Sequence, residues 1–386
     1  MLNIVGAGLP APNLILSEEL KFLTKRSIIL KEEFEKRRSI LIYVYRGGLM
    51  LSAMIIGFVL SKVHLPIPYL MAGIMISVFC KCFVKDDRLS WPKLYREYAL
   101  YIAGYGIGVK FTDDTLHKII DQVLGIGLSN VLMLMICLVL SYLTFRWTHE
   151  DYKSCILGIL PGGLTMSMLM AEEDDSYNPN IIMVMQVIRL FGVLFTVPIL
   201  VIMLFDAHAQ EAGMLAAGVG HIPWYALLVL SPVGYYVAKA LHLPTPRLLG
   251  PILAAAVASV LGGGVQAPPG ILLMMTQASI GLFIGTQLEP YRLAKAKCCL
   301  PCVFLGVAFM LLISAGMAEF LAGYYHFDII TAFLALAPGG AAEMALAGLS
   351  MGADVSIIVA YQLARLVMVN VTVPPLIHYL VKHKLA

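Results

Sequence analysis

The stretch Leu336–Arg365 reads LAPGGAAEMALAGLSMGADVSIIVAYQLAR and contains the feature around which the chain is arranged. A Pro-Gly-Gly triplet interrupts an apolar run, Glu343 follows about one helical turn later, and Arg365 lies deep in the next apolar segment. Proline removes a backbone donor and glycine tolerates almost any φ/ψ combination, so the triplet predicts a break inside a helix.

The same pattern occurs a second time from Leu160 to Arg189, in LPGGLTMSMLMAEEDDSYNPNIIMVMQVIR. The two triplets lie 177 positions apart (338 − 161), and the two arginines lie 176 positions apart (365 − 189). Two more motif pairs, HLPIPYLMAG with HLPTPRLLGP and GYGIG with GLFIG, follow at offsets of 178 and 177. Such constant offsets indicate an internal duplication. Two halves of this size are typical of duplicated membrane transporters.

The composition excludes an ordinary soluble protein. Hydrophobic residues make up 60% of the chain, charged residues make up 13%, and the mean hydropathy is +0.84. A soluble domain averages roughly 45–50% apolar and about 25% charged residues. Charge-free runs such as 122–145 and 298–318 can span roughly 30 Å of hydrocarbon as helices. We therefore predict an all-α membrane protein with about 10–12 transmembrane segments.

The segments divide the chain into four expected parts. They are a charged, amphipathic N-terminal segment (1–45), a first membrane repeat (46–205), a linker (206–222) and a second membrane repeat (223–386). The basic loops of the two repeats fall in opposite phase, so the positive-inside rule predicts that the second repeat is inverted. Inversion requires that one apolar segment is re-entrant or that the linker crosses the membrane.

The helix break predicted at each triplet needs a polar environment. In lipid, the freed N–H and C=O groups must be satisfied, so a break survives only inside protein or beside a water-filled cavity. The half-helix after Gly340 then directs bare N–H groups and a positive dipole end into this cavity, with Glu343 in its first turn. A simple kink for packing is the alternative.

Each predicted helix after a break carries an arginine near the bilayer interior, where a charge costs several kcal/mol unless it faces a partner or water. A glutamine lies three residues before each arginine, Gln186 before Arg189 and Gln362 before Arg365. This spacing places each glutamine on the same helix face as its arginine. An arginine fork beside an amide suits a carboxylate or another anion. Equally, each arginine could cap carbonyls at the end of the opposing half-helix, which leaves both interpretations open.

The two copies are not equivalent, because Glu343 aligns with Met166 and the first copy offers Thr165 and Ser167 there. One hypothesis is that Glu343 neutralises Arg365 and leaves Arg189 free to bind. The candidate solute- or ion-binding residues are Pro161, Gly162, Gly163, Thr165, Gln186 and Arg189 in the first copy, with Pro338, Gly339, Gly340, Glu343, Gln362 and Arg365 in the second.

The remaining residue clusters indicate little chemistry. Cys298, Cys299 and Cys302 lie close together, but no neighbouring histidine or second CxxC completes a metal pattern, so we expect small apolar fillers. His64 and His242 precede matched proline pairs and are expected to form turns. We expect no metal, no cofactor beyond a coupling proton or sodium ion, and no nucleic-acid partner.

The quoted motifs resemble those of the AbrB/AidB-regulator family of bacterial polytopic membrane proteins. The resemblance rests on PGGLTMSMLMA with Gln186 and Arg189, on APGGAAEMALAGL with Gln362 and Arg365, and on the two HLP motifs, and it runs from about Gly47 to Lys382. It implies the bacterial inner membrane. Family members are labelled regulators of an alkylation-response gene or ammonia monooxygenases. In repeat plan they resemble cation:proton antiporters and anion transporters with two crossed broken helices, although this chain lacks the paired intramembrane aspartates of sodium/proton antiporters.

These observations favour a secondary transporter of a small, anionic solute that binds between the two broken helices, with Glu343 as the coupling carboxylate. The alternative is a membrane sensor or regulator of gene expression that uses the same pocket without transport. A membrane monooxygenase is disfavoured because it needs clustered metal ligands, and we expect no enzyme. The expected partners are the lipid bilayer and the solute, and a homo-oligomer stays open.

Overall fold

The computed structural model describes residues 40–83, 91–148, 150–162, 167–168, 170–171, 177–205, 220–288 and 298–382. The chain divides into two units, and the smaller one comprises residues 1–48 and 86–89, of which 40–48 are described and helical. The larger unit contains everything else and is considered by itself below. Most of the N-terminal part and of the linker (1–39 and 206–219) therefore lies outside the described residues.

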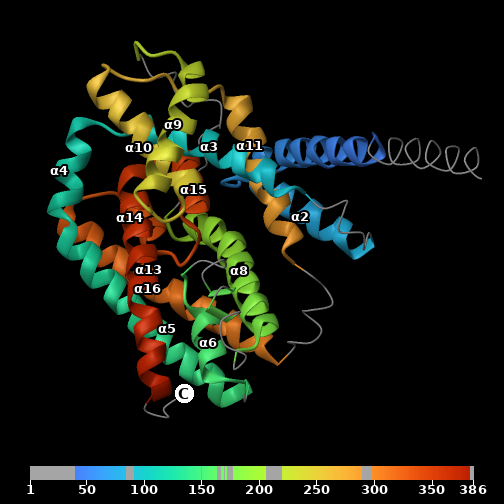
Figure 1. Cartoon of the computed structure of the whole chain (residues 1–386), viewed down its shortest axis with the longest axis vertical. Coiled ribbons are helices and arrows are strands. Elements are labelled where there is room, and N and C mark those ends of the chain that lie inside the picture. The colour runs from blue at the N-terminus through green and yellow to red at the C-terminus, as the bar shows by residue number, and fades with distance from the viewer. Residues whose placement is uncertain are drawn as a thin grey trace, which may run out of the picture. The chain divides into compact units, whose positions relative to one another are not determined.

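The regular elements of the described part are helices, apart from one isolated bridge between Ile222 and Val265 (Figure 1). A helix at Ile40–Lys62 comes first. The others are α2 (Pro68–Phe83), α3 (Lys93–Gly108), α4 (Asp113–Asp121), α5 (Val123–Thr148), α6 (Tyr152–Ile159), α8 (Pro179–Phe205), the 3₁₀ turn η2 (Trp224–Ala226), α9 (Leu227–Ala240), α10 (Pro246–Leu261), α11 (Gly270–Thr286), α13 (Cys299–Tyr325), α14 (Ile329–Leu336), α15 (Ala341–Met351) and α16 (Val355–Lys382).

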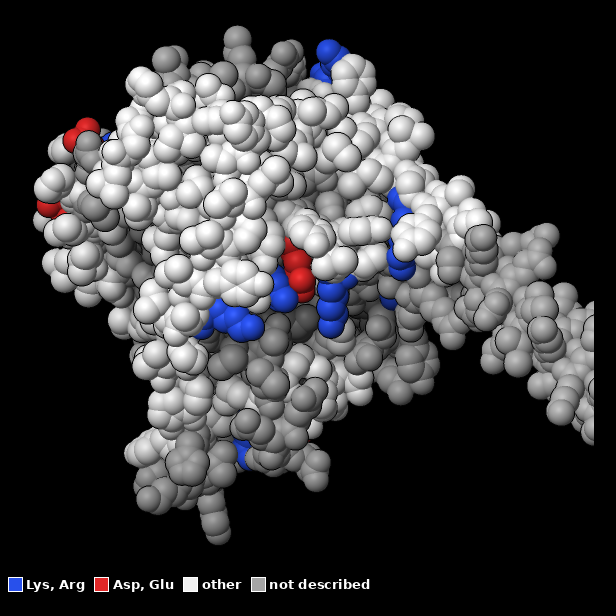
Figure 2. All heavy atoms as spheres, turned by 45° about the horizontal axis from the view of Figure 1, so that its top comes forward, with Lys and Arg blue, Asp and Glu red and all other residues white. Residues whose placement is uncertain are grey.

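In the part of the chain that the structure describes, five helices are long and apolar enough to cross a membrane, with mean hydropathies between 1.6 and 2.5. They are Ile40–Lys62, Val123–Thr148, Pro179–Leu204, Cys299–Tyr325 and Val355–Ile377. Their outer faces are apolar as well: Leu124, Leu128 and Met135 of α5 are all exposed. Figure 2 shows a face with few charged side chains: basic groups gather beside one acidic group near its centre, and the other charges lie towards its edges. This pattern suits lipid as the surrounding solvent, which confirms an all-α membrane protein.

Helices follow one another in the same order in the two halves of the chain. The starts of α2 and α10 are 178 positions apart (246 − 68), and those of α3 and α11 are 177 apart (270 − 93). The starts of α5 and α13, of α6 and α14, and of α8 and α16 are offset by 176, 177 and 176 (299 − 123, 329 − 152 and 355 − 179). The inverted orientation of the second half and the full number of crossings stay predictions.

Glycines of the duplicated motif lie where helices from different halves cross. A Cβ at Gly104 of α3 would lie 2.6 Å from the carbonyl oxygen of Leu248 in α10. A Cβ at Gly285 of α11 would lie 2.8 Å from the carbonyl oxygen of Ile74 in α2. Lipid tails are as apolar as the side chains, so such close backbone packing stabilises helix association in place of the hydrophobic effect.

The two HLP motifs form matched corners before α2 and α10. His64 and His242 have positive φ values of 57° and 52°, in the left-handed region. Ile67 and Thr245 have φ values of 49° and 45°, and α2 and α10 begin directly after them. The prediction that the duplicated histidines form turns is confirmed.

Candidate functional site

The second Pro-Gly-Gly triplet separates two short helices. Helix α14 ends at Leu336 and α15 begins at Ala341. Between them the backbone is extended, with ψ values of 134° at Ala337 and 146° at Gly340. The break predicted from the sequence is therefore present here.

The first triplet also ends a short helix. Helix α6 stops at Ile159, Leu160 is extended (φ −64°, ψ 132°), and Pro161 and Gly162 are not helical. Gly163 and Thr165, which are also candidate site residues, lie outside the described residues. So do Met166 and the acidic residues 172–175.

Arg365 and Gln362 of α16 bind the carbonyl groups that the second break leaves open. The Arg365 guanidinium donates to the carbonyl oxygens of Ala337 (2.9 Å) and Gly339 (2.7 Å), and also to the Gln362 side-chain oxygen. The Gln362 amide donates to the carbonyl of Leu334 (2.8 Å) and to that of Ala337 (3.0 Å). The last carbonyls of a helix have no partner within it, so these side chains complete the end of α14.

Counted over the described residues, the first copy has the same plan with fewer bonds. Arg189 of α8 donates to the carbonyl oxygen of Ile159 at 2.7 Å, and Gln186 donates to that of Leu157 at 2.7 Å. Gln186 also donates to the Ser167 hydroxyl at 2.7 Å. Among the described residues this single carbonyl is the hydrogen-bond partner of the Arg189 guanidinium, which carries five N–H donors.

The charges of both arginines are buried without a carboxylate partner among the described residues. Arg189 is 8% exposed and Arg365 is 5% exposed, and the Nε atom of each is buried without a hydrogen-bond partner. The ion pairs found among the described residues, Lys118–Asp354 and Arg247–Glu97, involve neither of them. The two guanidinium groups lie within electrostatic range of each other and of the fully buried Cys137 in α5.

Glu343 does not pair with Arg365, contrary to the hypothesis of neutralisation. Its buried carboxylate folds back towards the start of its own helix, where a Cβ at Gly340 would overlap Glu343 Oε2. The cation that acts on Glu343 is Arg96 of α3, which stacks on the Phe283 ring at 4.9 Å. The N–H groups and dipole at the start of α15 also favour a negative charge there.

A small cavity lies beside the first break. It lies between Gly162, Ser167 and the Asn370 side of α16, and its volume is about 20 Å³. A cavity of this size can hold one water molecule. Among the described residues, this cavity by itself is therefore too small for an organic solute.

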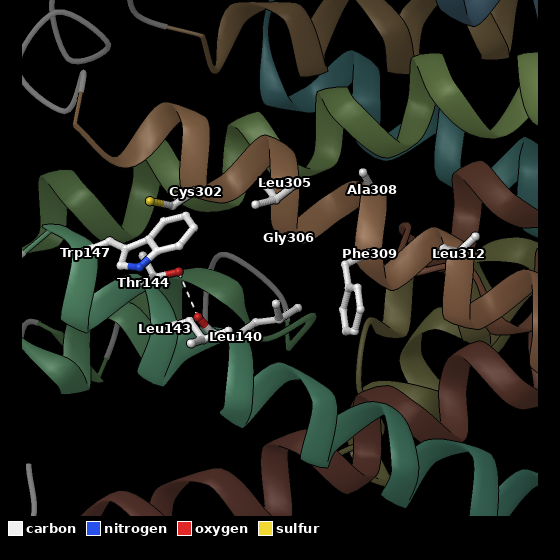
Figure 3. Close-up of a pocket in the computed structure, with 10 residues that line it drawn as sticks. All are labelled: Leu140, Leu143, Thr144, Trp147, Cys302, Leu305, Gly306, Ala308, Phe309 and Leu312. Atoms are coloured by element: carbon white, nitrogen blue, oxygen red, sulfur yellow. Dashed lines mark hydrogen bonds between the residues drawn. The ribbon is translucent and has the colours of Figure 1, made fainter.

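The large groove of the described part is a poor candidate for a polar solute. It lies between α5 and α13, measures about 530 Å³ and is lined mainly by Leu140, Leu143, Trp147, Leu305, Phe309 and Leu312 (Figure 3). Its hydroxyl, on Thr144, already donates to the Leu140 carbonyl at 2.8 Å. The other polar groups of its lining are the neutral indole N–H of Trp147 and the thiol of Cys302. Without a charged group to pair with a charged solute, the groove suits an acyl chain better.

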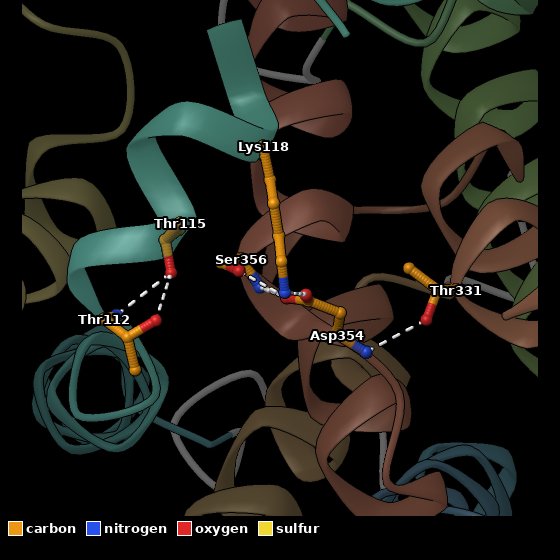
Figure 4. A network of polar contacts seen from close by, with 6 residues as sticks. All are labelled: Thr112, Thr115, Lys118, Thr331, Asp354 and Ser356. Carbon is orange, nitrogen blue, oxygen red and sulfur yellow. Dashed lines mark hydrogen bonds and ion pairs between the residues drawn. The ribbon is translucent and has the colours of Figure 1, made fainter. Parts of the chain in front are cut away.

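A polar network at the start of α16 was not predicted from the sequence. The backbone N–H of Asp354 donates to Thr331 Oγ1 of α14 at 2.9 Å, and Lys118 of α4 lies 3.5 Å from the Asp354 carboxylate (Figure 4). In the first copy, Asn178 N–H donates to Ser154 Oγ at 2.9 Å in the corresponding place. A polar residue directly before a helix is a known N-cap signal that could have indicated Asp354.

Comparison with known proteins agrees with this architecture. The profile of the AbrB family, described as "Transition state regulatory protein AbrB", matches residues 69–381. The "Uncharacterized protein YhjN" of Bacillus subtilis (strain 168) is 26% identical over 353 residues, which cover 84% of this chain and 91% of that protein. The "Putative regulator AbrB" of Escherichia coli (strain K12) is 27% identical over 351 residues, 86% of this chain and 96% of that protein. This multi-pass helical membrane protein therefore belongs to the AbrB family.

Proposed function

We propose that the chain is a secondary transporter of a small anionic solute in a bacterial inner membrane, with the solute bound beside Arg189 between the two helix breaks. The observation that carries this proposal is the state of the Arg189 guanidinium, which is buried, unpaired by a described carboxylate, and bonded to one carbonyl. A buried charge left without a partner costs several kcal/mol. An anion that forms two parallel hydrogen bonds with the guanidinium would remove this cost.

The second copy supports the assignment because it already contains the carboxylate that the first copy lacks. Glu343 lies at the start of α15, and the aligned position in the first copy is Met166. The first copy therefore has no carboxylate of its own at this position, and in this proposal the solute supplies one that pairs with Arg189, a contact that Glu343 does not make with Arg365. Glu343 itself is then the group that binds the coupling proton or sodium ion.

Entry of the solute requires a change of conformation. The described cavity at the first break holds about one water molecule, so we infer that it must widen before a solute can bind there. Repeat-built transporters open by moving one group of helices against another around a fixed site. Helices α2, α3, α10 and α11, which pack through glycine-lined crossings, form one such group. The two breaks belong to other helices.

Transport in proteoliposomes tests the proposal directly. The purified chain is reconstituted and offered a panel of labelled carboxylates and other small anions, with and without a proton or sodium gradient. We expect flux that falls at least about tenfold in Arg189→Ala, a loss of 1.4 kcal/mol or more. Arg146→Ala, which removes an exposed arginine at the end of α5, is the matched control and should transport normally.

A membrane regulator is the second candidate, favoured by the word "regulator" in the name of the Escherichia coli relative. It predicts saturable binding of an anion that depends on Arg189, without flux under any gradient. Absence of both binding and flux for every anion, in protein that is folded and monodisperse, would contradict both functions. The same assays treat the chain as a carrier or receptor and not as an enzyme.

A further inference from the structure

Three metal-ligand side chains from distant parts of the sequence meet at one end of α13. They are Glu150, in the connection between α5 and α6, with Cys298 and Cys299, where α13 begins. Their carboxylate and sulfur atoms all lie within 4.8 Å of one another. The sequence places the glutamate almost 150 positions from the cysteines, so only the folded chain brings this set together.

The spacing of the sulfur atoms fits a tetrahedral metal ion. Cys298 Sγ and Cys299 Sγ are 3.8 Å apart. With Zn–S bonds of about 2.3 Å, the edge of a tetrahedron between two sulfur ligands is about 3.8 Å. An ion can therefore bridge the two sulfur atoms at their present separation.

The surroundings favour a soft cation over a hard one. Two more thiols interact electrostatically with the set, Cys155 of α6 and Cys302 of α13. Thiolates select Zn²⁺ and its heavier relatives, whereas Mg²⁺ and Ca²⁺ prefer oxygen ligands alone. Cys302 lies one turn after Cys299 but outside the group of three ligand atoms, so a water molecule would be the fourth ligand.

The alternative of apolar filling explains only part of the cluster. Cys155 is fully buried, but Cys298 is exposed, and Glu150 is a charged residue beside it. Apolar filling accounts for neither of these two residues, whereas both are ordinary ligands of a metal ion.

We propose that Glu150, Cys298 and Cys299 form a binding site for one thiophilic divalent cation of the zinc type. The bound ion joins the α5–α6 connection of the first half to the start of α13 in the second. This site is independent of the proposed anion site at the helix breaks, since it uses none of the same residues.

Titration of the full chain with cadmium tests the site. The protein is purified in detergent, reduced and freed of metal, and Cd²⁺ is added while the ultraviolet cadmium–thiolate absorption is recorded. We expect saturation at one Cd²⁺ per chain and displacement by Zn²⁺. Cys298→Ser, Cys299→Ser and Glu150→Gln should each weaken binding by about a hundredfold or more, because even groups that only orient a ligand contribute about ten- to hundredfold.

The control variant removes two thiols from another part of the chain. Cys80→Ser with Cys82→Ser, both in α2, should leave Cd²⁺ binding unchanged. Loss of binding in this control, or titration without saturation, would overturn the proposal.

A second measurement needs no variant and so does not depend on whether the variants fold. Zinc-edge X-ray absorption of the wild-type protein should show at least two sulfur ligands at about 2.3 Å. A spectrum with only oxygen and nitrogen ligands would overturn the site, as would protein whose Cys298 and Cys299 remain joined in a disulfide under reducing conditions.

Discussion

Substitution of the two buried arginines should affect stability and function to different extents, because the two guanidinium groups make different numbers of hydrogen bonds. Arg365 donates to two backbone carbonyls, those of Ala337 and Gly339, whereas Arg189 donates to one, that of Ile159. We predict that Arg365→Ala lowers the free energy of unfolding more than Arg189→Ala does. Flux or anion binding should show the opposite order wherever the protein remains folded.

The magnitude follows from the bonds that are lost. A hydrogen bond to a charged group contributes about 1.5–3 kcal/mol, so the loss is about 3–6 kcal/mol for Arg365 and about 1.5–3 kcal/mol for Arg189. Bonds between helices in membranes are often weaker, at about 0.6 kcal/mol on average, which makes these values upper limits. Either substitution also removes the repulsion between the two guanidinium groups, so this repulsion leaves the difference between them unchanged.

Reversible unfolding in mixed lipid–detergent micelles measures this difference. Each substitution is compared with wild type by the midpoint and slope of the unfolding curve, with Arg146→Ala as the control for an exposed arginine. Adding Gln362→Ala to Arg365→Ala completes a double-mutant cycle, in which we expect clear coupling because both side chains bind the Ala337 carbonyl. Equal destabilisation by the two arginine substitutions, or a larger effect of Arg189→Ala, would refute the reasoning.

Three further predictions follow from individual contacts. Gly104→Ala should cost about 1–3 kcal/mol of stability, because the added methyl group overpacks the crossing with α10. Gly127→Ala, whose methyl group would meet nothing within 4 Å, should be neutral or stabilising by up to about 1 kcal/mol. Thermal unfolding of the two variants measures this difference. Lys118→Ala should cost at most about 1 kcal/mol of stability, because its ion pair with Asp354 is largely exposed. A larger loss in unfolding curves would show that the polar network around Asp354 contributes more to stability than an exposed ion pair does. Glu343→Gln should abolish the dependence of flux on the proton or sodium gradient while anion binding persists, and an unchanged gradient dependence would exclude Glu343 as the coupling group.

The sequence was sufficient for the parts of the fold that depend on local chemistry and repetition. Pro338 directly followed by two glycines combines a missing donor with a permissive backbone and so indicated a helix break, and matched offsets indicated the order of helices in both halves. The spacing of Gln362 and Arg365 placed both on one helix face, which the structure also shows. Which carbonyls they bind depends on how α16 packs on α14, and no local pattern contains that information.

The remaining contacts depend on tertiary packing. Arg96 lies in a stretch rich in basic residues that reads as a loop, yet in the fold its helix brings it towards Glu343. The clustered cysteines showed no metal pattern because the third ligand, Glu150, belongs to the other half of the chain. Both contacts join residues at least 148 positions apart (298 − 150). Residues so far apart in the sequence cannot be paired from motif spacing alone.

The unequal bonding of the two breaks has a mechanical consequence. Ser314 of α13 donates to the Leu336 carbonyl, whereas its counterpart 177 positions earlier is Cys137, a much weaker donor. Together with the extra bonds of Arg365, this makes the end of α14 stiffer than the end of α6. We therefore expect the second half of the duplication to act as a rigid anchor and the first half to change conformation more readily. We expect relatives that carry different cargo to vary most around residues 157–189, since change there leaves the anchor intact.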